Sequence, residues 1–392
     1  MVWLAHTGWE WHNGALLFIS KQGFCVRFFV LCLCLLSFNA FAVNVSDLYR
    51  ISVAVDDQTE ESRKLGVQWA FQQLLIKVSG YQEVLSNPTL VAASNNANRY
   101  MQGFSYHQDN VDDQVYLQAW FSKALLIPLM RRANAPIWGE NRPLLLNWLA
   151  VESSEVVVEP VANLDGGIVF ESDVNAVAST QADGNGGRLL ISEQVPEWQT
   201  RLGRAFSERG LPILWPMNDL EDQTELPLNQ LWWLVSEPII KASERYQADA
   251  VLAGKLNQSA AGAWQYEGIL FRGEQRLPIL TEGDSPLAAL TNVSTQVGRF
   301  FADQFAIKSD PMNGRSGIRI LVKKVKDFSD YSKVLAYLQS ISGVRLVEVA
   351  QVDRDNLQLY LNLEGSWDKV QRIIRLDNKL SSLQEKEFEW AQ

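Results

Sequence analysis

The sequence has few of the side chains on which most catalytic and metal sites depend. Cysteine occurs three times in 392 residues, at Cys25, Cys32 and Cys34, and two of the three histidines, His6 and His12, lie in the same amino-terminal stretch. Removal of that stretch would leave no cysteine and one histidine. A disulfide and a Cys-His nucleophile are then excluded, as are most zinc sites, which need several His or Cys ligands.

The remaining histidine, His107, follows an aromatic stretch and precedes Gln108, Asp109 and Asn110, which is typical of the polar end of a strand. It is therefore expected to be structural. The sequence also lacks the GxGxxG, GxxxxGK(S/T) and GxSxG patterns, which hold phosphates or present a nucleophilic serine. We therefore expect no cofactor and no metal ion.

Positive charge is in short supply. Lys and Arg number 35 against 45 Asp and Glu, which gives a net charge of −10, and no basic block occurs. Phosphate contacts need clustered Lys and Arg, so nucleic acid is not an expected partner.

Residues 1–42 have the pattern of a signal peptide. Lys21 and Arg27 precede an apolar run that ends in Ala40-Phe41-Ala42, and a positive flank, an apolar core and a small-x-small end predict cleavage after Ala42. The alternative is a retained membrane anchor, but residues 28–42 fall short of the ~20 that cross a bilayer. No later stretch is long and apolar enough to span a membrane. We expect a periplasmic protein.

The next segment, residues 43–152, is predicted to be an amino-terminal α/β module. Residues 48–55 alternate as a strand does, and Asp57 with Glu60 is predicted to cap a long, mostly buried helix that ends at Gly80. Leu65 and Trp69 are expected among its buried residues. Further strands are predicted over residues 115–121 and 143–151, and the second of these is apolar enough to be buried on both faces.

Residues 153–187 are predicted to be a flexible insertion, because Asn, Ser, Asp, Ala and Gly dominate their second half and cannot bury a core. A middle α/β module is expected over residues 188–308. Its predicted elements are a helix from Pro196 to Gly210, a strand over 211–215, a helix over 228–246 that kinks or restarts at Pro238, a hairpin of 248–256 with 263–271, and a helix that begins after Ser285.

Residues 309–316 are a predicted linker, and residues 317–392 a carboxy-terminal module. Its patterns follow the order βαββα, which is typical of a ferredoxin-like fold, and residues 48–133 can be written in the same order. The predicted class is therefore α/β, more closely α+β, in two or three small modules.

Several short motifs resemble a known family. They are Val53–Gln58, Trp138–Pro143, Arg209–Pro212 with Pro216 and Asp219–Asp222, and Tyr246–Leu252. In this order behind a signal peptide they resemble the domain of unknown function 2066 family of Gram-negative bacteria. That resemblance implies an exported envelope protein with no established activity. The middle module also resembles the amino-terminal domain of TolB-type periplasmic proteins, a likeness that implies fold alone.

Carboxylates are the most numerous of the side chains that serve in catalysis. Asp56 and Asp57 lie at a strand-to-helix turn, and Asp219, Glu221 and Asp222 lie on a loop after a strand. A glycosidase needs two carboxylates ~5–9.5 Å apart, so these are candidate catalytic residues. Acidic residues before a helix also cap its first turn, and we favour that simpler interpretation.

Tryptophan could serve binding, because aromatic rings near carboxylates can bind sugars or peptides. Trp215, Trp232 and Trp233 flank the acidic loop. Helical spacing places Trp232 on the apolar face of its helix and turns Trp233 away from it. Trp215, Trp233 and Glu221 are therefore the candidate binding residues.

Three functions remain open. The favoured one is a non-enzymatic binding or assembly factor with a protein partner in the cell envelope. The alternatives are a carboxylate-dependent hydrolase of peptidoglycan or another glycan, and a carrier of a small ligand or lipid.

Overall fold

The structure, a computed structural model, describes residues 47–108, 114–152, 187–308 and 317–391. Helices combine with mixed and antiparallel sheets, so the predicted α+β class is confirmed. The predicted signal peptide and linker, and residues 153–186 of the predicted insertion, lie outside the described residues. Within the described ranges, no helix is both long and apolar enough to cross a membrane.

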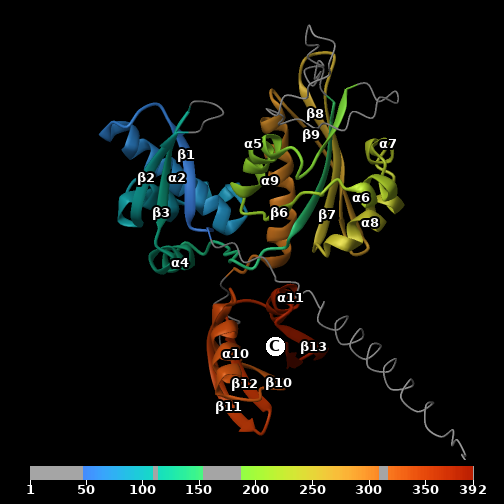
Figure 1. Cartoon of the computed structure of the whole chain (residues 1–392). Coiled ribbons are helices and arrows are strands. Elements are labelled where there is room, and N and C mark those ends of the chain that lie inside the picture. The colour runs from blue at the N-terminus through green and yellow to red at the C-terminus, as the bar shows by residue number, and fades with distance from the viewer. Residues whose placement is uncertain (1–46, 109–113, 153–186, 309–316, 392) are drawn as a thin grey trace, which may run out of the picture. The chain divides into compact units, whose positions relative to one another are not determined.

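The amino-terminal part forms an antiparallel sheet in the order β1-β3-β2, against which α2 packs (Figure 1). Phe71, Leu74 and Leu75 of α2 are fully buried, whereas Leu65 and Trp69 are exposed, so our expectation that these two are buried was wrong. The elements are β1 (Arg50–Val55), α2 (Glu60–Ser79), η1 (Gln82–Ser86), α3 (Pro88–Ser94), η2 (Ala97–Arg99), β2 (Met101–Gln108), β3 (Val115–Phe121) and α4 (Lys123–Arg132).

The start of α2 differs from the prediction. Thr59, not Asp57, is the N-cap: its side chain accepts a hydrogen bond from the Ser62 N–H. Asp57 instead accepts hydrogen bonds from the Thr59 N–H and hydroxyl, and so orients the capping residue. The end of α2 is as predicted, because Gly80 adopts the left-handed conformation (φ 81°) that stops a helix.

The middle part is built on a sheet in the order β5-β4-β7-β8-β9, with β6 paired to the start of β4. β4 pairs parallel to β7, and all but the last of its residues are buried, which confirms the predicted two-sided burial. The strand β9 was not predicted, and β6 is shorter than expected. The strands are β4 (Leu145–Glu152), β5 (Arg188–Ile191), β6 (Ile213–Leu214), β7 (Ala250–Gln258), β8 (Trp264–Arg272) and β9 (Gln275–Gly283).

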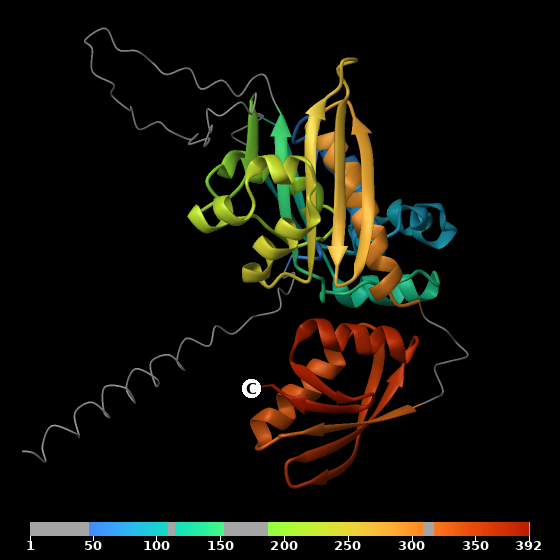
Figure 2. The same ribbon diagram turned by 90° about the vertical axis from the view of Figure 1, so that its right-hand side faces the viewer.

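Helices cover both faces of this sheet (Figure 1 and Figure 2). Alternate residues of β4 explain why: Leu145 and Leu149 belong to one core with α5 and α9, whereas Leu146 and Trp148 belong to another with α7 and α8. The helices are α5 (Pro196–Ser207), α6 (Leu220–Glu225), α7 (Leu228–Trp232), α8 (Ser236–Ser243), η3 (Glu244–Tyr246) and α9 (Pro286–Phe305).

The helical stretch over residues 228–246 restarts, which is one of the two predicted outcomes, but it does so shortly before Pro238 rather than at it. The break lies between α7 and α8, where Leu234 has a positive φ of 52°. Pro238 is instead the third residue of α8, a position at which its missing N–H breaks no intrahelical hydrogen bond.

The carboxy-terminal part has the predicted order βαββα, followed by a hairpin that was not predicted. Its sheet order is β11-β12-β10-β14-β13, in which β10 is antiparallel to β12 and parallel to β14. In both this sheet and β1-β3-β2, the third strand along the chain lies between the first and the second. The elements are β10 (Gly317–Lys323), α10 (Phe328–Ser340), β11 (Val344–Asp353), β12 (Asn356–Leu363), α11 (Trp367–Asp377), β13 (Leu380–Gln384) and β14 (Glu387–Trp390).

Candidate functional site

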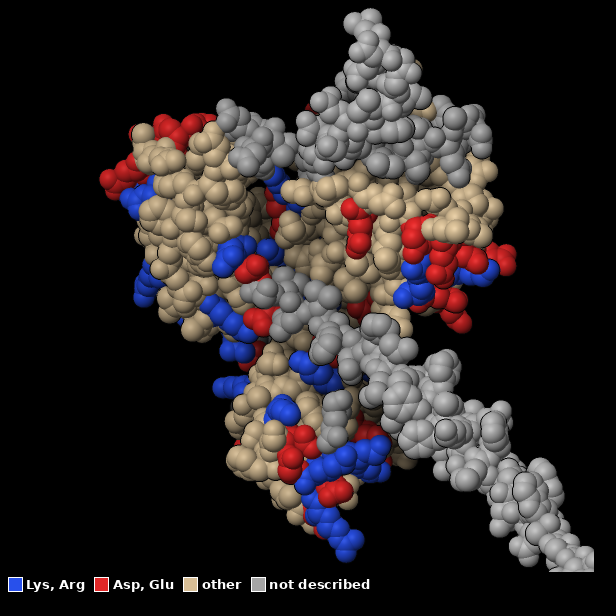
Figure 3. All heavy atoms as spheres, viewed as in Figure 1, with Lys and Arg blue, Asp and Glu red and all other residues tan. Residues whose placement is uncertain are grey.

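The acidic loop of the middle part lies at the start of α6, in the helical layer formed by α6, α7 and α8. Asp219 is the N-cap of α6, and its side chain accepts a hydrogen bond from the Asp222 N–H at 3.0 Å. Acidic side chains gather around a few basic ones over this layer (Figure 3). A hollow of about 240 Å³ lies here, lined by Glu221, Asp222, Glu225, Lys241, Ala242, Glu244 and Arg245.

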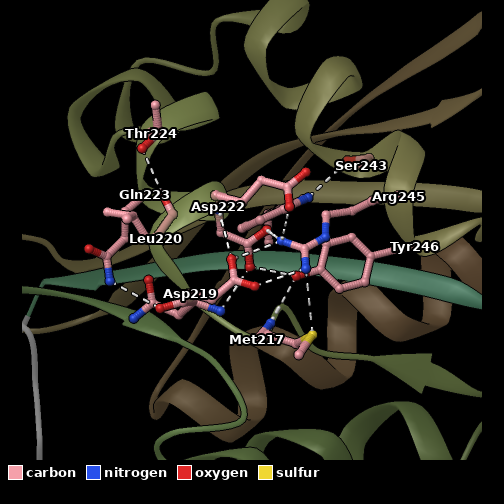
Figure 4. A network of polar contacts seen from close by, with 12 residues as sticks. Met217, Asp219, Leu220, Asp222, Gln223, Thr224, Ser243, Arg245 and Tyr246 are labelled. Atoms are coloured by element: carbon pink, nitrogen blue, oxygen red, sulfur yellow. Dashed lines mark hydrogen bonds and ion pairs between the residues drawn. The ribbon is translucent and has the colours of Figure 1, made fainter. Parts of the chain in front are cut away.

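Arg245 forms ion pairs with the carboxylates of this loop (Figure 4). Its two terminal nitrogens each lie 2.8 Å from a different Asp219 oxygen, and Nη1 also lies 3.4 Å from Glu221 and 3.2 Å from Asp222. The hydrogen bonds from Arg245 and from the Asp222 N–H lower the pKa of Asp219 to about 2. A general acid needs a raised pKa, so this environment suits a loop anchor better than an acid.

Asp222 is the buried member of the cluster, with 1% of its surface exposed. It accepts hydrogen bonds from the Asn218 N–H at 2.8 Å and from the Tyr246 hydroxyl at 2.5 Å. Burial and this hydrogen bond raise the pKa of Tyr246. Asp222 thus ties the loop, whose Asn218 has a positive φ of 56°, to η3, which directly follows α8.

We expect Asp222→Asn to lower the free energy of unfolding by about 2 kcal/mol, because a buried charged acceptor is replaced by an amide. Asp219→Asn should cost at most about 0.5 kcal/mol, since asparagine caps a helix as well as aspartate and the ion pair with Arg245 is exposed. Urea denaturation measures both. Loss of a glycan-cleaving activity in Asp219→Asn at unchanged stability would contradict the structural role and favour catalysis.

The other candidate carboxylates, Asp56 and Asp57, are exposed before α2. Hydrogen bonds from Ser62 and Thr59 lower the pKa of Asp57, so this side chain also organises a helix start. His107 is exposed near the end of β2 and stacks on Tyr116, with ring centroids 5.4 Å apart. Among the described residues, no group of three or more His, Cys, Asp and Glu side chains is placed to hold a metal ion.

The tryptophans separate clearly by exposure. Trp215 and Trp232 are buried, at 7% and 6% exposed, whereas Trp233 is 72% exposed at the end of α7. Trp215 therefore offers no accessible ring to a ligand, and Trp233 does. Glu221 is accessible as well, although it lies near Arg245.

A second set of residues, which sequence reasoning missed, joins Trp233 at the sheet. Lys255 of β7, Glu267 of β8 and Leu280 of β9 are opposite one another in the strand register, so their side chains lie in one row on one face. Lys255 Nζ lies 2.9 Å from Glu267 and 5.7 Å from the Trp233 ring centroid. Leu280 is 71% exposed. We call Trp233, Lys255, Glu267 and Leu280 the Trp233 surface.

Cation–π and ion-pair contacts surround Trp232, which precedes Trp233 in the chain. Two cations contact the buried Trp232 ring: the Arg188 guanidinium is 4.1 Å and Lys255 Nζ 5.6 Å from its centroid. Arg188 also forms an ion pair with Glu152 of the neighbouring strand β4 at 3.2 Å. Such cation–π and ion-pair contacts restrain the long side chains of Arg188 and Lys255.

Sheet edges are less suited to binding by strand addition, because most edge strands contain a bulge or a proline that disturbs pairing. β11, β13 and β2 each contain a register shift typical of a β-bulge. The edge strand β9 contains Pro278, which has no N–H to donate. The exposed face around Trp233 is therefore the better binding surface.

Comparison with known proteins identifies one family model, described as "Domain of unknown function (DUF8605)", which matches residues 42–139. The expected resemblance to the domain of unknown function 2066 family was wrong, because the matching domain is a different one. Of the motifs that carried that resemblance, only Val53–Gln58 lies wholly inside the matched range, and such short motifs are weak support. No curated protein and no solved structure matches the chain.

Proposed function

We propose that the protein is a non-enzymatic binding or assembly factor of the cell envelope, exported to the periplasm, and that it holds a partner protein at the Trp233 surface. The observation that carries this proposal is the 72% exposure of Trp233 beside the Lys255–Glu267 ion pair and the exposed Leu280. Tryptophan is among the residues that contribute most to binding energy in protein interfaces, and its ring offers a large apolar area at small entropic cost.

The chemistry of the surface suits a protein partner. Two large apolar side chains, Trp233 and Leu280, lie on either side of a charged pair. Apolar anchors provide affinity, whereas the ion pair between Lys255 and Glu267 favours a partner with complementary charges. The export step rests on the signal pattern of residues 1–42.

Hydrolysis by the acidic loop is the less well supported alternative. Arg245 occupies Asp219 on both oxygens, and Asp222 is buried and engaged by Tyr246. The hollow of about 240 Å³ beside them is smaller than the ~300–1,000 Å³ of most ligand pockets.

We expect Trp233→Ala to weaken binding of the envelope partner at least about 30-fold, which corresponds to ~2 kcal/mol for a central interface tryptophan. The partner is first captured from envelope extracts by cross-linking to the purified wild-type protein, and the affinity of each variant is then measured by biolayer interferometry. Because Trp233 is exposed, the substitution should change stability by no more than about 0.5 kcal/mol.

Trp69→Ala is the matched control, since Trp69 is 52% exposed on α2, outside the Trp233 surface. It should bind as the wild type does. Equal affinities of the wild type and Trp233→Ala for the captured partner would refute the proposed surface, and so would a loss in both variants alike.

A further inference from the structure

A cavity of about 300 Å³ lies where three segments meet: the residues that follow α2, those that follow α5, and the middle of α9. Its lining includes Tyr81, Glu83, Arg209, Gly298 and Arg299. The volume is at the lower end of the range for small-molecule pockets. The cavity is separate from the acidic loop and from the Trp233 surface, with which it shares no lining residue.

The charged side chains around the cavity differ in their partners. Arg299 pairs with Glu83, and Tyr81 donates a hydrogen bond to Asp303 at 2.7 Å. The half-buried Arg209 is different, because its Nη1 has no hydrogen-bond partner among the described residues and is shielded from solvent. A buried donor without a partner points to a group that the protein itself does not supply.

Further cations surround Arg209. The carbonyl oxygen of Arg209 accepts a hydrogen bond from the buried Arg142, and Lys77 lies close to Arg142. Glu208 is the carboxylate that attracts Arg209, and it is shared with Arg204 and Lys77. Burial lowers the pKa of Arg209, and the attraction of Glu208 opposes this only in part. Glu208 is therefore shared by three cations, and it does not occupy Nη1 of Arg209.

We propose that this cavity binds a small oxyanion, a carboxylate or a phosphate, through the guanidinium of Arg209. A planar guanidinium matches both groups, which accept two parallel hydrogen bonds from it. Gly298 leaves the space open, because a Cβ at this position would meet only Arg209 Cβ, at 3.9 Å. This site is independent of the proposed protein partner.

The proposal is tested by calorimetric titration of the purified protein with sodium phosphate and with sodium succinate. Sodium chloride at matched ionic strength is the reference in each case, and the two titrations distinguish a phosphate ligand from a carboxylate ligand. We expect saturable binding of at least one of these anions. Arg209→Met should weaken that binding at least about tenfold, because charge-assisted hydrogen bonds are lost. Gly298→Val should weaken it similarly by filling the cavity while Arg209 stays in place.

Arg345→Met, at an exposed arginine of β11, and Trp233→Ala should both bind the anion as the wild type does. Thermal unfolding of each variant, measured in parallel, shows that the folded state is retained. Absence of saturable binding of both anions to the folded wild type would overturn the proposal. Equal binding by Arg209→Met and the wild type would overturn it as well.

Discussion

Replacement of Arg142 by methionine is expected to lower the free energy of unfolding by at least about 3 kcal/mol. The side chain is 2% exposed, and in the part of the chain that the structure describes all four of its hydrogen bonds go to backbone carbonyl groups. Its Nε reaches Gly139 at 2.7 Å, and its Nη2 reaches Lys77 at 2.7 Å and Trp138 at 2.8 Å. Its Nη1 reaches Arg209 at 3.3 Å.

The large effect follows from geometry. Arg142 joins the end of α2, the segment before β4 and the segment after α5, and its guanidinium stacks on the Trp138 ring at 3.7 Å. Methionine would fill part of the volume but would leave the buried carbonyl oxygens without donors. Arg142→Lys should be nearly as harmful, because an ammonium group lacks the planar fork that reaches several acceptors at once.

Urea denaturation followed by tryptophan fluorescence measures this loss. Arg132→Met is the control, since Arg132 is exposed at the end of α4, and it should change stability by no more than about 0.5 kcal/mol. Comparable stability of Arg142→Met and Arg132→Met would mean that the four hydrogen bonds contribute nothing net.

The second large effect is expected from Gly268→Ala, which should destabilise the protein by about 3 kcal/mol through overpacking. Gly254 and Gly268 are opposite each other on β7 and β8, and the buried Tyr266 lies against both. A Cβ at Gly268 would lie 2.4 Å from the Tyr266 hydroxyl oxygen and 2.6 Å from the carbonyl oxygen of Ala253. The ring and the strand would both have to move.

A double-mutant cycle separates the contact with the Tyr266 hydroxyl from the contact with the Ala253 carbonyl. The Tyr266 hydroxyl has no hydrogen-bond partner among the described residues, so Tyr266→Phe alone should preserve or raise stability. In the Gly268→Ala background, Tyr266→Phe should recover part of the loss. Gly103→Ala in β2 is the control, because its Cβ would meet Trp120 at an ordinary 3.6 Å. Equal stability of the two glycine variants would refute the packing argument.

Much of the architecture follows from local patterns. Gly80 stops α2, Ser285 caps α9 by accepting a hydrogen bond from the Ala288 N–H, and the apolar run of β4 is buried on both faces. These features depend on backbone periodicity and on hydrogen bonds within one turn, so a single stretch of sequence contains all the information. The contrast between Trp232 and Trp233 likewise follows from helical spacing.

The sequence also located the acidic loop, but it left the role of these carboxylates open. Their environment depends on Arg245 and Tyr246, which lie more than 20 residues further along the chain and reach Asp219 and Asp222 only because α8 packs beside α6. The position of an ion pair across two helices is a property of their packing. No sequence pattern near the loop predicts this ion pair.

The sequence by itself therefore determined the α+β class, the end of α2 at Gly80, the start of α9 after Ser285 and the exposure of Trp233. Only the tertiary structure decided that Lys255, Glu267 and Leu280 form one row beside this ring, and that Arg142 and Arg209 meet at one junction. Strand register and the burial of charge depend on the free energy of contacts between segments distant in sequence, whereas caps and periodicity depend on neighbours within a few residues.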